Sequence, residues 1–263
     1  MRSEGQIVWI TGASSGIGEA LAHELAERGA RLVLSSRRRE ELERVRAACE
    51  HPDRHDVVPL DLADPDSLEA AAAEVLDRHG HVDVMVHNGG VSQRSLARET
   101  DMAVVRRLME VDYFGTVALT QALLPSMRQR GEGRFVVVSS LVGKVATPLR
   151  SGYSAAKHAL HGYFEALRAE EHGSGVRVTM VCPGFIRTRV TYNALTADGT
   201  PQDTMDRAQE NGMSPETCAK KIARAVEEGR PEVLVGGWER VAVWAWRLSP
   251  AVYRWLIRKM RVT

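Results

Sequence analysis

Tyr153 and Lys157 are spaced so that their side chains can act together on a proton. The segment YSAAK places them four residues apart, and on a helix that spacing puts both on one face. A phenol has an ordinary pKa near 10, which is too high for efficient proton exchange at neutral pH. A lysine ammonium beside the phenol favours the phenolate. Such a pair is common by chance at protein surfaces, so it predicts an acid/base pair only together with other signals.

Ser140 is a second polar group placed where it could serve the same reaction. It lies thirteen residues before Tyr153, directly after an apolar stretch, residues 134–139, that predicts a strand. Parallel sheets present their functional groups at the carboxyl ends of strands. We therefore expect the Ser140 hydroxyl to hold a substrate oxygen while Tyr153 transfers its proton.

A glycine-rich turn near the start of the chain predicts a phosphate site. TGASSGIG follows the first apolar run and opens a helix, with the spacing GxxxGxG rather than GxGxxG. Glycines allow a tight turn and a close approach of the backbone to a pyrophosphate, which then lies at the helix N-terminus. A ligand-free strand–helix turn is the alternative interpretation. The residues assigned to the phosphate site are Gly12, Ser14, Ser15, Gly16, Ile17 and Gly18.

The end of the second predicted strand distinguishes the two nicotinamide dinucleotides. An acidic side chain there would bind the ribose 2′-hydroxyl of NAD, whereas an arginine would bind the 2′-phosphate of NADP. Here the strand continues into Ser36, Arg37, Arg38 and Arg39, and the first acid is Glu40. We assign Ser36 and Arg37 to the cofactor and expect the next two arginines to be solvated. The predicted cofactor is NADP(H).

Apolar runs alternate with helical patterns along the whole chain. This alternation predicts an α/β fold, a Rossmann-type doubly wound parallel sheet with helices on both faces, in a single domain spanning residues 1–263. The predicted strands are 7–10, 31–35, 57–60, 82–86, 134–139, 177–182 and 232–235, and the predicted helices are 19–28, 40–50, 67–78, 102–127, 153–171 and 215–228. Residues 186–213 form a polar, irregular stretch that predicts a substrate loop.

Composition excludes several other classes of protein. The net charge of +1 gives no bulk attraction to nucleic acid, and we predict no nucleic-acid partner. Three widely spaced cysteines argue against a disulfide framework, and the nine scattered histidines do not form a metal motif, so we predict no metal. There is no apolar run of about 18 residues, and the N-terminus leads directly into a strand, leaving no room for a signal peptide. We expect a cytoplasmic protein.

The order and separation of these motifs resemble the short-chain dehydrogenase/reductase family across about residues 5–190. Besides the glycine turn and YxxxK, the chain has DL at 61–62, Asn88 to Gly90 after a strand, SS at 139–140 and PG at 183–184. The resemblance implies Ser140, Tyr153 and Lys157 as the catalytic set. It further implies that cofactor contacts come from Asp61, Leu62, Asn88, Gly90, Tyr153, Lys157, Pro183, Gly184, Ile186 and Thr188.

Two departures from the family pattern concern the centre of the site. The usual NNAG reads HNGG, His87 to Gly90, which keeps Asn88. Asp112 replaces the asparagine of the catalytic tetrad, whose main-chain carbonyl holds a water linked to the lysine in this family. A main-chain role survives the change, and a harmless substitution is one interpretation. The other is that a negative charge near Lys157 alters the proton relay.

Beyond the common core, the chain resembles the dehydrogenase/reductase member 7 group of that family. The matching segments are NALTADG at 193–199, Met205–Asp206, GMSPETCAKKI at 212–222 and EVLVGGWE at 232–239. This group is linked to retinoids, steroids and other apolar carbonyls. The resemblance therefore implies an apolar carbonyl or alcohol as the small-molecule substrate, and a homodimer or homotetramer as the assembly.

The C-terminal segment, residues 240–263, is rich in tryptophan and contains six basic residues and no acid. After Pro250, Val252, Trp255, Leu256 and Met260 share one helical side and arginines the other. A basic amphipathic helix with tryptophan is typical of a membrane surface. The alternative, which we favour, is a lid over an apolar pocket or a subunit contact.

Two other functions fit parts of the sequence. A non-catalytic NADP(H)-binding protein, acting in redox sensing or as a scaffold, would explain Asp112 but not the intact Ser140, Tyr153 and Lys157. A sugar-nucleotide epimerase would need a larger C-terminal substrate domain. The leading hypothesis is a carbonyl reductase or alcohol dehydrogenase.

Overall fold

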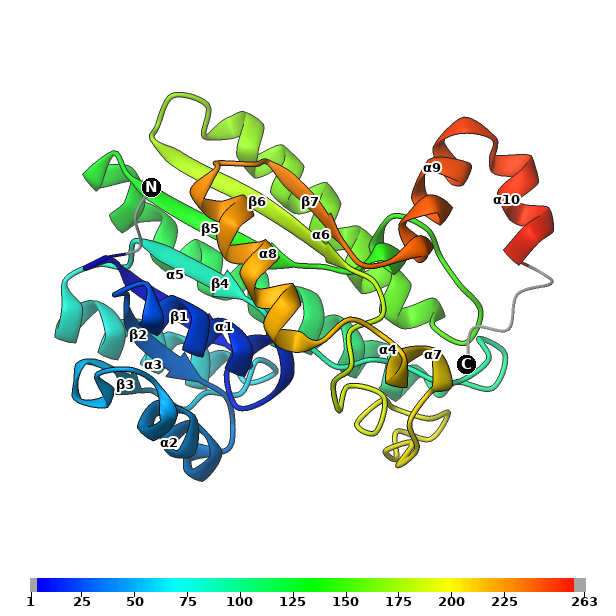
Figure 1. Cartoon of the computed structure of the whole chain (residues 1–263), viewed down its shortest axis with the longest axis horizontal. Coiled ribbons are helices and arrows are strands. Elements are labelled where there is room, and N and C mark those ends of the chain that lie inside the picture. Colours follow the sequence, from blue (N-terminus) through cyan, green and yellow to red (C-terminus); the bar gives the residue numbers. More distant parts are fainter. Residues whose placement is uncertain (1–3, 258–263) are drawn as a thin grey trace.

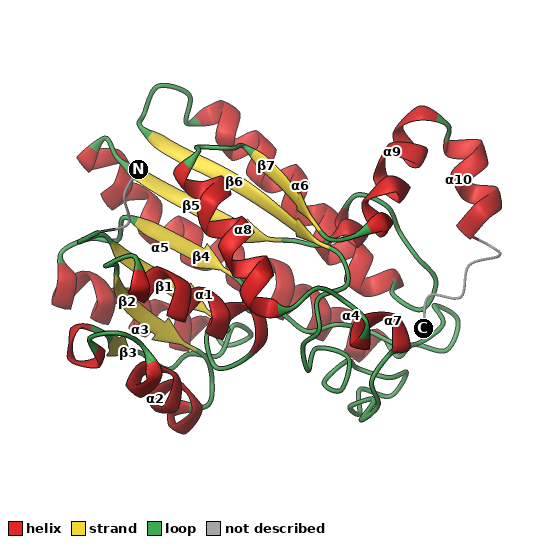
Figure 2. Ribbon diagram, viewed as in Figure 1, coloured by secondary structure: helices red, strands yellow, loops and turns green. Residues whose placement is uncertain are grey.

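A computed structural model describes residues 4–257 of the chain. Its centre is a seven-stranded sheet in the order β3-β2-β1-β4-β5-β6-β7, in which every neighbouring pair is parallel (Figure 2). The predicted α/β fold is confirmed. The strands are β1 Ile7–Thr11, β2 Arg31–Ser35, β3 Asp56–Val57, β4 Val84–His87, β5 Gly133–Val138, β6 Val176–Pro183 and β7 Glu232–Val235.

Helices cover both faces of the sheet, and alternating strand residues pack against the two layers (Figure 1). In β1, Val8 and Ile10 belong to the core beneath one layer, while Ile7 and Trp9 belong to the other. This two-sided burial explains why the strands read as continuous apolar runs. The first layer contains α1 Gly16–Glu27, α2 Arg39–Ala48 and α8 Pro215–Glu227, and the second contains α3 Pro65–His79, α5 Gly115–Arg130 and α6 Ser151–Glu170.

The long helix predicted over residues 102–127 is interrupted. The chain forms α4 Met102–Met109, then a π-helical turn at Glu110–Phe114, and only then α5. Periodicity could not reveal this, because a π-turn adds one residue without breaking the helix. Such turns are frequent at functional sites, and this one contains Asp112.

The third strand is shorter than predicted, with two residues instead of four. Backbone pairing nevertheless continues beyond it, since the amides of Val58 and Leu60 donate to the carbonyls of Leu34 and Ser36. The strand lies at the edge of the sheet and pairs on one side only.

The last part of the chain forms elements that were not predicted individually. The 186–213 loop contains a short helix, α7 Arg207–Glu210. After β7, the helices α9 Val241–Leu248 and α10 Pro250–Ile257 form a helical hairpin that projects from the carboxyl end of the sheet (Figure 1). No helix among the described residues is both long and apolar enough to cross a bilayer.

Candidate active site

A cleft of about 570 Å³ runs along the carboxyl ends of the strands. Its walls bring together the segments after β1, β2, β4, β5 and β6, as expected where the strand order reverses between β1 and β4. Every residue assigned to cofactor binding lines it except Gly18. These residues are Gly12, Ser14, Ser15, Gly16, Ile17, Ser36, Arg37, Asp61, Leu62, Asn88, Gly90, Tyr153, Lys157, Pro183, Gly184, Ile186 and Thr188.

The glycine turn is held by close packing. Gly12 has a φ of +66°, and a Cβ there would lie 2.8 Å from the Cα of Gly89. Gly18 lies behind the turn, where a Cβ would be 2.3 Å from the carbonyl oxygen of Gly12. Gly18 therefore shapes the turn rather than lining the cleft.

The start of α1 is suited to bind phosphate. Its N-cap residue, Ser15, makes no side-chain hydrogen bond to the first turn. The first amides of the helix are thus not capped by that side chain, and the helix dipole favours an anion at this end.

Arginines follow β2 at the far end of the cleft. Arg37 and Arg38 both line it, and the Arg38 guanidinium donates to Ser14 Oγ at 3.2 Å. Arg38 is exposed, in line with our expectation that it is solvated, but the turn after β2 also brings it to the cleft wall over the glycine turn. Arg39 does not line the cleft.

Asp61 and Leu62 lie on the wall beyond β3, close to an arginine that sequence reasoning missed. Arg107 of α4 lines the cleft, and its guanidinium is 3.6 Å from Asp61 Oδ2. The start of α5 approaches closely here, since a Cβ on Gly115 would be 2.2 Å from the Leu62 carbonyl oxygen.

Asn88 fastens β4 to the glycine turn. Its side-chain amide donates to the carbonyls of Thr11 and Gly12 at 3.1 and 3.2 Å. The neighbouring His87 is buried, and burial lowers its pKa to about 3, so it is neutral. Its Nε2 lies 2.9 Å from the Thr120 hydroxyl. His87, which stands where the family has asparagine, therefore lies buried outside the cleft lining and contacts Thr120 there.

Ser140, Tyr153 and Lys157 meet in the cleft as predicted from their spacing. The Ser140 hydroxyl donates to the Pro183 carbonyl at 3.4 Å and accepts from the amide of Val142 at 3.3 Å. The Lys157 ammonium lies 5.6 Å from the centre of the Tyr153 ring and donates to the Val138 carbonyl at 3.3 Å.

Burial raises the pKa of the Tyr153 phenol, and Lys157 and Ser140 only partly oppose this. The sequence predicted that the lysine favours the phenolate. Lys157 does favour the phenolate, but in the protein alone burial of the phenol raises its pKa by more than Lys157 lowers it. The Tyr153 phenol is therefore protonated at neutral pH.

Gln93 holds the start of α6, the helix that carries Tyr153 and Lys157, and sequence reasoning did not identify this contact. Its fully buried side-chain oxygen accepts from the amides of Gly152 and Tyr153 at 2.8 and 3.2 Å, which caps the start of α6. Its amide nitrogen donates to the hydroxyls of Ser95 and Thr100. Because Gln93 is far from Tyr153 in sequence, no local pattern could reveal this contact.

Asp112 is fully buried beside Lys157. Its Oδ1 accepts from the Val91 amide at 2.8 Å and lies 3.9 Å from the Lys157 ammonium. Its Oδ2 is buried without a hydrogen-bond partner among the described residues. Burial raises the pKa of Asp112 to about 6, against the opposing effect of Lys157. The departure from asparagine thus places a titratable carboxyl 3.9 Å from the Lys157 ammonium.

A second cavity, of about 140 Å³, adjoins the cleft. Ser140 and Tyr153 line both spaces. Its walls are mainly apolar and come from the segment after β5, the loop after β6 and the C-terminal hairpin. They include Leu141, Val142, Val145, Phe185, Val190, Trp238, Ala242, Tyr253 and Ile257.

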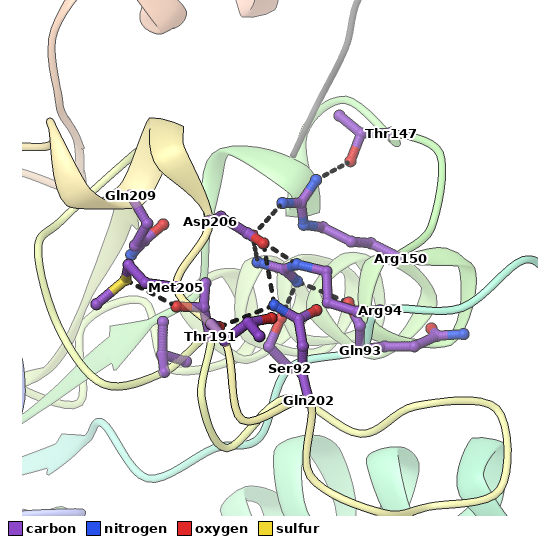
Figure 3. A network of polar contacts seen from close by, with 12 residues as sticks. Ser92, Gln93, Arg94, Thr147, Arg150, Thr191, Gln202, Met205, Asp206 and Gln209 are labelled. Atoms are coloured by element: carbon purple, nitrogen blue, oxygen red, sulfur yellow. Dashed lines mark hydrogen bonds and ion pairs between the residues drawn. The ribbon is translucent and has the colours of Figure 1, made fainter.

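The 186–213 loop is fastened to the body by one buried carboxylate (Figure 3). Asp206 Oδ2 pairs with the guanidinium of Arg94 at 2.6 Å and with that of Arg150 at 3.4 Å. Gln202 donates to the other oxygen at 3.1 Å. All three charged side chains are nearly buried, so Asp206 ties this part of the predicted substrate loop to the body of the protein.

Within residues 4–257, no group of three or more histidine, cysteine, aspartate or glutamate side chains is arranged to hold a metal ion.

Comparisons with known proteins agree with this geometry. A family model described as short chain dehydrogenase matches residues 6–198. The chain is 44% identical over 264 residues to a dehydrogenase/reductase SDR family protein 7-like from Anopheles gambiae, covering 97% of this chain and 83% of the relative.

Solved structures share the fold along nearly the whole chain. A short chain dehydrogenase from Burkholderia cenocepacia in complex with NADP is 26% identical, with a TM-score of 0.80, covering 98% of this chain and 99% of its own. A short chain dehydrogenase/reductase from Burkholderia phymatum in complex with NAD has a TM-score of 0.86 at 22% identity, covering 96% of both chains, and shows the fold alone. These two neighbours hold different cofactors, NADP in the first and NAD in the second.

Proposed function

This chain belongs to the short-chain dehydrogenase/reductase family of nicotinamide-dependent oxidoreductases, and we propose that it moves a hydride between NADP(H) and the carbonyl or alcohol of an apolar substrate. The family membership agrees with the resemblance drawn from the motifs. The cofactor choice, the substrate class and the roles of individual residues are the parts that we propose.

The observation that carries the proposal is the position of Tyr153 and Ser140 between two spaces of different character. One is the long cleft that begins at the glycine turn, and the other is the small apolar cavity. A dinucleotide in the cleft and an apolar carbonyl in the cavity would therefore meet at these two side chains.

The cleft fits a dinucleotide on this chain's own features. The uncapped start of α1 suits a pyrophosphate, and the packed glycine turn allows its close approach. Arg37 and Arg38, with no acid at the end of β2, suit a 2′-phosphate and support NADP(H) over NAD(H). When bound, the cofactor supplies or accepts the hydride.

In the reducing direction, the carbonyl carbon gains the hydride and its oxygen gains a proton from Tyr153. The Ser140 hydroxyl holds that oxygen, and Lys157 stabilises the phenolate that remains. The raised pKa of Tyr153 keeps the phenol protonated before reaction, which suits a general acid. The apolar walls exclude water from the reacting carbon.

The substrate class follows from those walls. Their side chains offer apolar contact over most of the cavity, which favours an apolar ketone, aldehyde or alcohol. The cytoplasmic location and the homodimer or homotetramer expected from the sequence stay predictions.

Tyr153→Phe tests the proposed chemistry. It keeps the ring and removes the transferable proton, so turnover of an apolar ketone with NADPH should fall by about 100-fold or more. NADPH affinity, measured by protein fluorescence, should stay within a few-fold. Tyr163→Phe is the matched control, since it removes a hydroxyl from the same helix outside the cleft. A Tyr153→Phe variant that keeps most of its turnover would show that another group transfers the proton.

A further inference from the structure

The C-terminal hairpin, together with the 3-10 turn Trp238–Arg240 that leads into it, exposes an unusual amount of apolar surface. Among the described residues, six of the eight large exposed hydrophobic side chains lie between residues 238 and 255. Leu248 is the most exposed of them, at 84%. We call these six residues the hairpin surface: Trp238, Val241, Trp244, Leu248, Val252 and Trp255.

The opposite side of the hairpin is anchored to the body. Val243 and Tyr253 are buried in a cluster with Leu141 and Val145, and the Tyr253 hydroxyl donates to the Ala146 carbonyl at 2.7 Å. The predicted apolar side of α10, represented by Val252 and Trp255, instead faces outward. The hairpin is thus apolar on both sides, and packing against the body accounts for only one of them.

Positive charge accompanies the hairpin surface. Arg240, Arg247 and Arg254 are exposed, and no acid occurs anywhere in residues 240–263. The last acid, Glu239, faces the body, where its carboxylate accepts from the amides of Phe185 and Gly237. Exposed tryptophans beside arginines without acids match the chemistry of an anionic bilayer surface.

A second copy of the chain is a poorer partner for this surface. In a symmetric dimer the same patch meets itself. Arginines would then face arginines, with no acid on the hairpin to compensate them. An anionic lipid surface presents the opposite charge, and tryptophan is favoured at the boundary between headgroups and acyl chains.

We propose that the hairpin surface docks the protein onto an anionic lipid bilayer and places the mouth of the apolar cavity against it. Trp238 connects the two features, because it belongs to the hairpin surface and also lines the cavity. Ala242, Tyr253 and Ile257, on the inner side of the same hairpin, line the cavity too. An apolar molecule dissolved in the bilayer would therefore reach the cavity without crossing bulk water. That last consequence rests on the proposed function, whereas docking does not.

Vesicle flotation of the full chain tests docking without turnover. The probe is a vesicle of phosphatidylcholine with about a quarter phosphatidylserine, compared with pure phosphatidylcholine. We expect binding to the anionic vesicles that weakens as salt rises, because screening shortens electrostatic attraction to about 8 Å at physiological ionic strength. Four of the five tryptophans lie in residues 238–255, so their emission should shift to the blue on binding.

Two variants with matched controls identify the surface. Trp244→Ala with Leu248→Ala should reduce vesicle binding roughly tenfold or more, whereas Met102→Ala, at an exposed position outside the hairpin, should not. Replacing Arg240, Arg247 and Arg254 by glutamine should reduce it roughly 100-fold. Replacing the exposed Arg54, Arg106 and Arg177 by glutamine changes the net charge of the protein by the same amount and should reduce vesicle binding much less.

The contrary outcomes are distinct. Full-length protein that does not float with anionic vesicles at low salt would overturn the proposal, as would hairpin variants that float as well as their controls. If Trp244→Ala with Leu248→Ala instead splits an oligomer, and the unmodified chain does not float, the surface joins two copies. Tyr153→Phe should float normally, so a failure of the proposed reaction leaves the docking result intact.

Discussion

Replacing Asp112 by asparagine should make the stability of the protein less dependent on pH. Asp112 is fully buried, and its pKa is raised from 3.8 to about 6. One pKa unit corresponds to about 1.4 kcal/mol, so ionising Asp112 costs about 3 kcal/mol more in the folded protein than in the unfolded chain. Asp112→Asn keeps the shape of the side chain and removes this cost.

The direction of the effect follows from proton binding. Between about pH 4 and pH 6, the folded protein holds a proton on Asp112 that the unfolded chain has lost. The stabilising contribution of the protonated group is therefore fully present below about pH 3.8 and is lost as pH rises through about 6. Relative to the unmodified protein, Asp112→Asn should gain about 2–3 kcal/mol between pH 4 and pH 7.

Urea unfolding of both proteins at several pH values measures this difference. Asp53→Asn, at an exposed position, controls for the change in net charge. A pH-independent difference would refute the reasoning from burial. A variant that loses stability as pH rises would show that the ion pair with Lys157 outweighs desolvation. The pH profiles of kcat/KM provide a second readout, and superimposable profiles would mean that the carboxyl does not affect the proton relay.

Two further predictions concern other parts of the site. Arg37→Ala and Arg38→Ala should each weaken NADPH binding roughly tenfold or more, with little change in NADH binding. Arg39→Ala, outside the cleft, should leave the binding of both cofactors unchanged. Titration by protein fluorescence measures these affinities, and equal losses for both cofactors would contradict a 2′-phosphate contact. Asp206→Asn removes the charge that Arg94 and Arg150 share, so it should destabilise the loop by about 3–5 kcal/mol, with faster proteolysis within residues 186–213 and a higher KM. Asp203→Asn, at an exposed position in the same loop, is the control. Equal proteolysis of the two variants would show that the ion pairs of Asp206 with Arg94 and Arg150 do not hold the loop.

The fold could be predicted because its determinants are local and periodic. Continuous apolar strands, helical stretches between them and a glycine turn at the first junction predict a covered parallel sheet. The carboxyl ends of parallel strands meet at one edge, which also predicts that Ser140 lies at that edge of the sheet. Gly12 and Gly16 adopt the positive φ angles that their residue type suggests. These features need only the covalent chain and short-range sterics.

Contacts between distant segments could not be read from the sequence. The π-turn that presents Asp112 looks like ordinary helix in its periodicity, and Gln93 caps a helix that begins almost 60 residues later. The sequence predicted a substrate loop at 186–213, but it did not show that Asp206 in this loop pairs with two buried arginines.

The electrostatic state of the site was likewise decided by the tertiary structure. The sequence shows that Lys157 lies near Tyr153 and that an acid stands at position 112. It does not show how much water each group loses. Burial turns the expected lowering of the Tyr153 pKa into a rise and makes Asp112 a group that titrates near pH 6. Residue types and spacing determined which chemistry is available, whereas the pKa of each group depends on desolvation, which arises only when distant elements pack together.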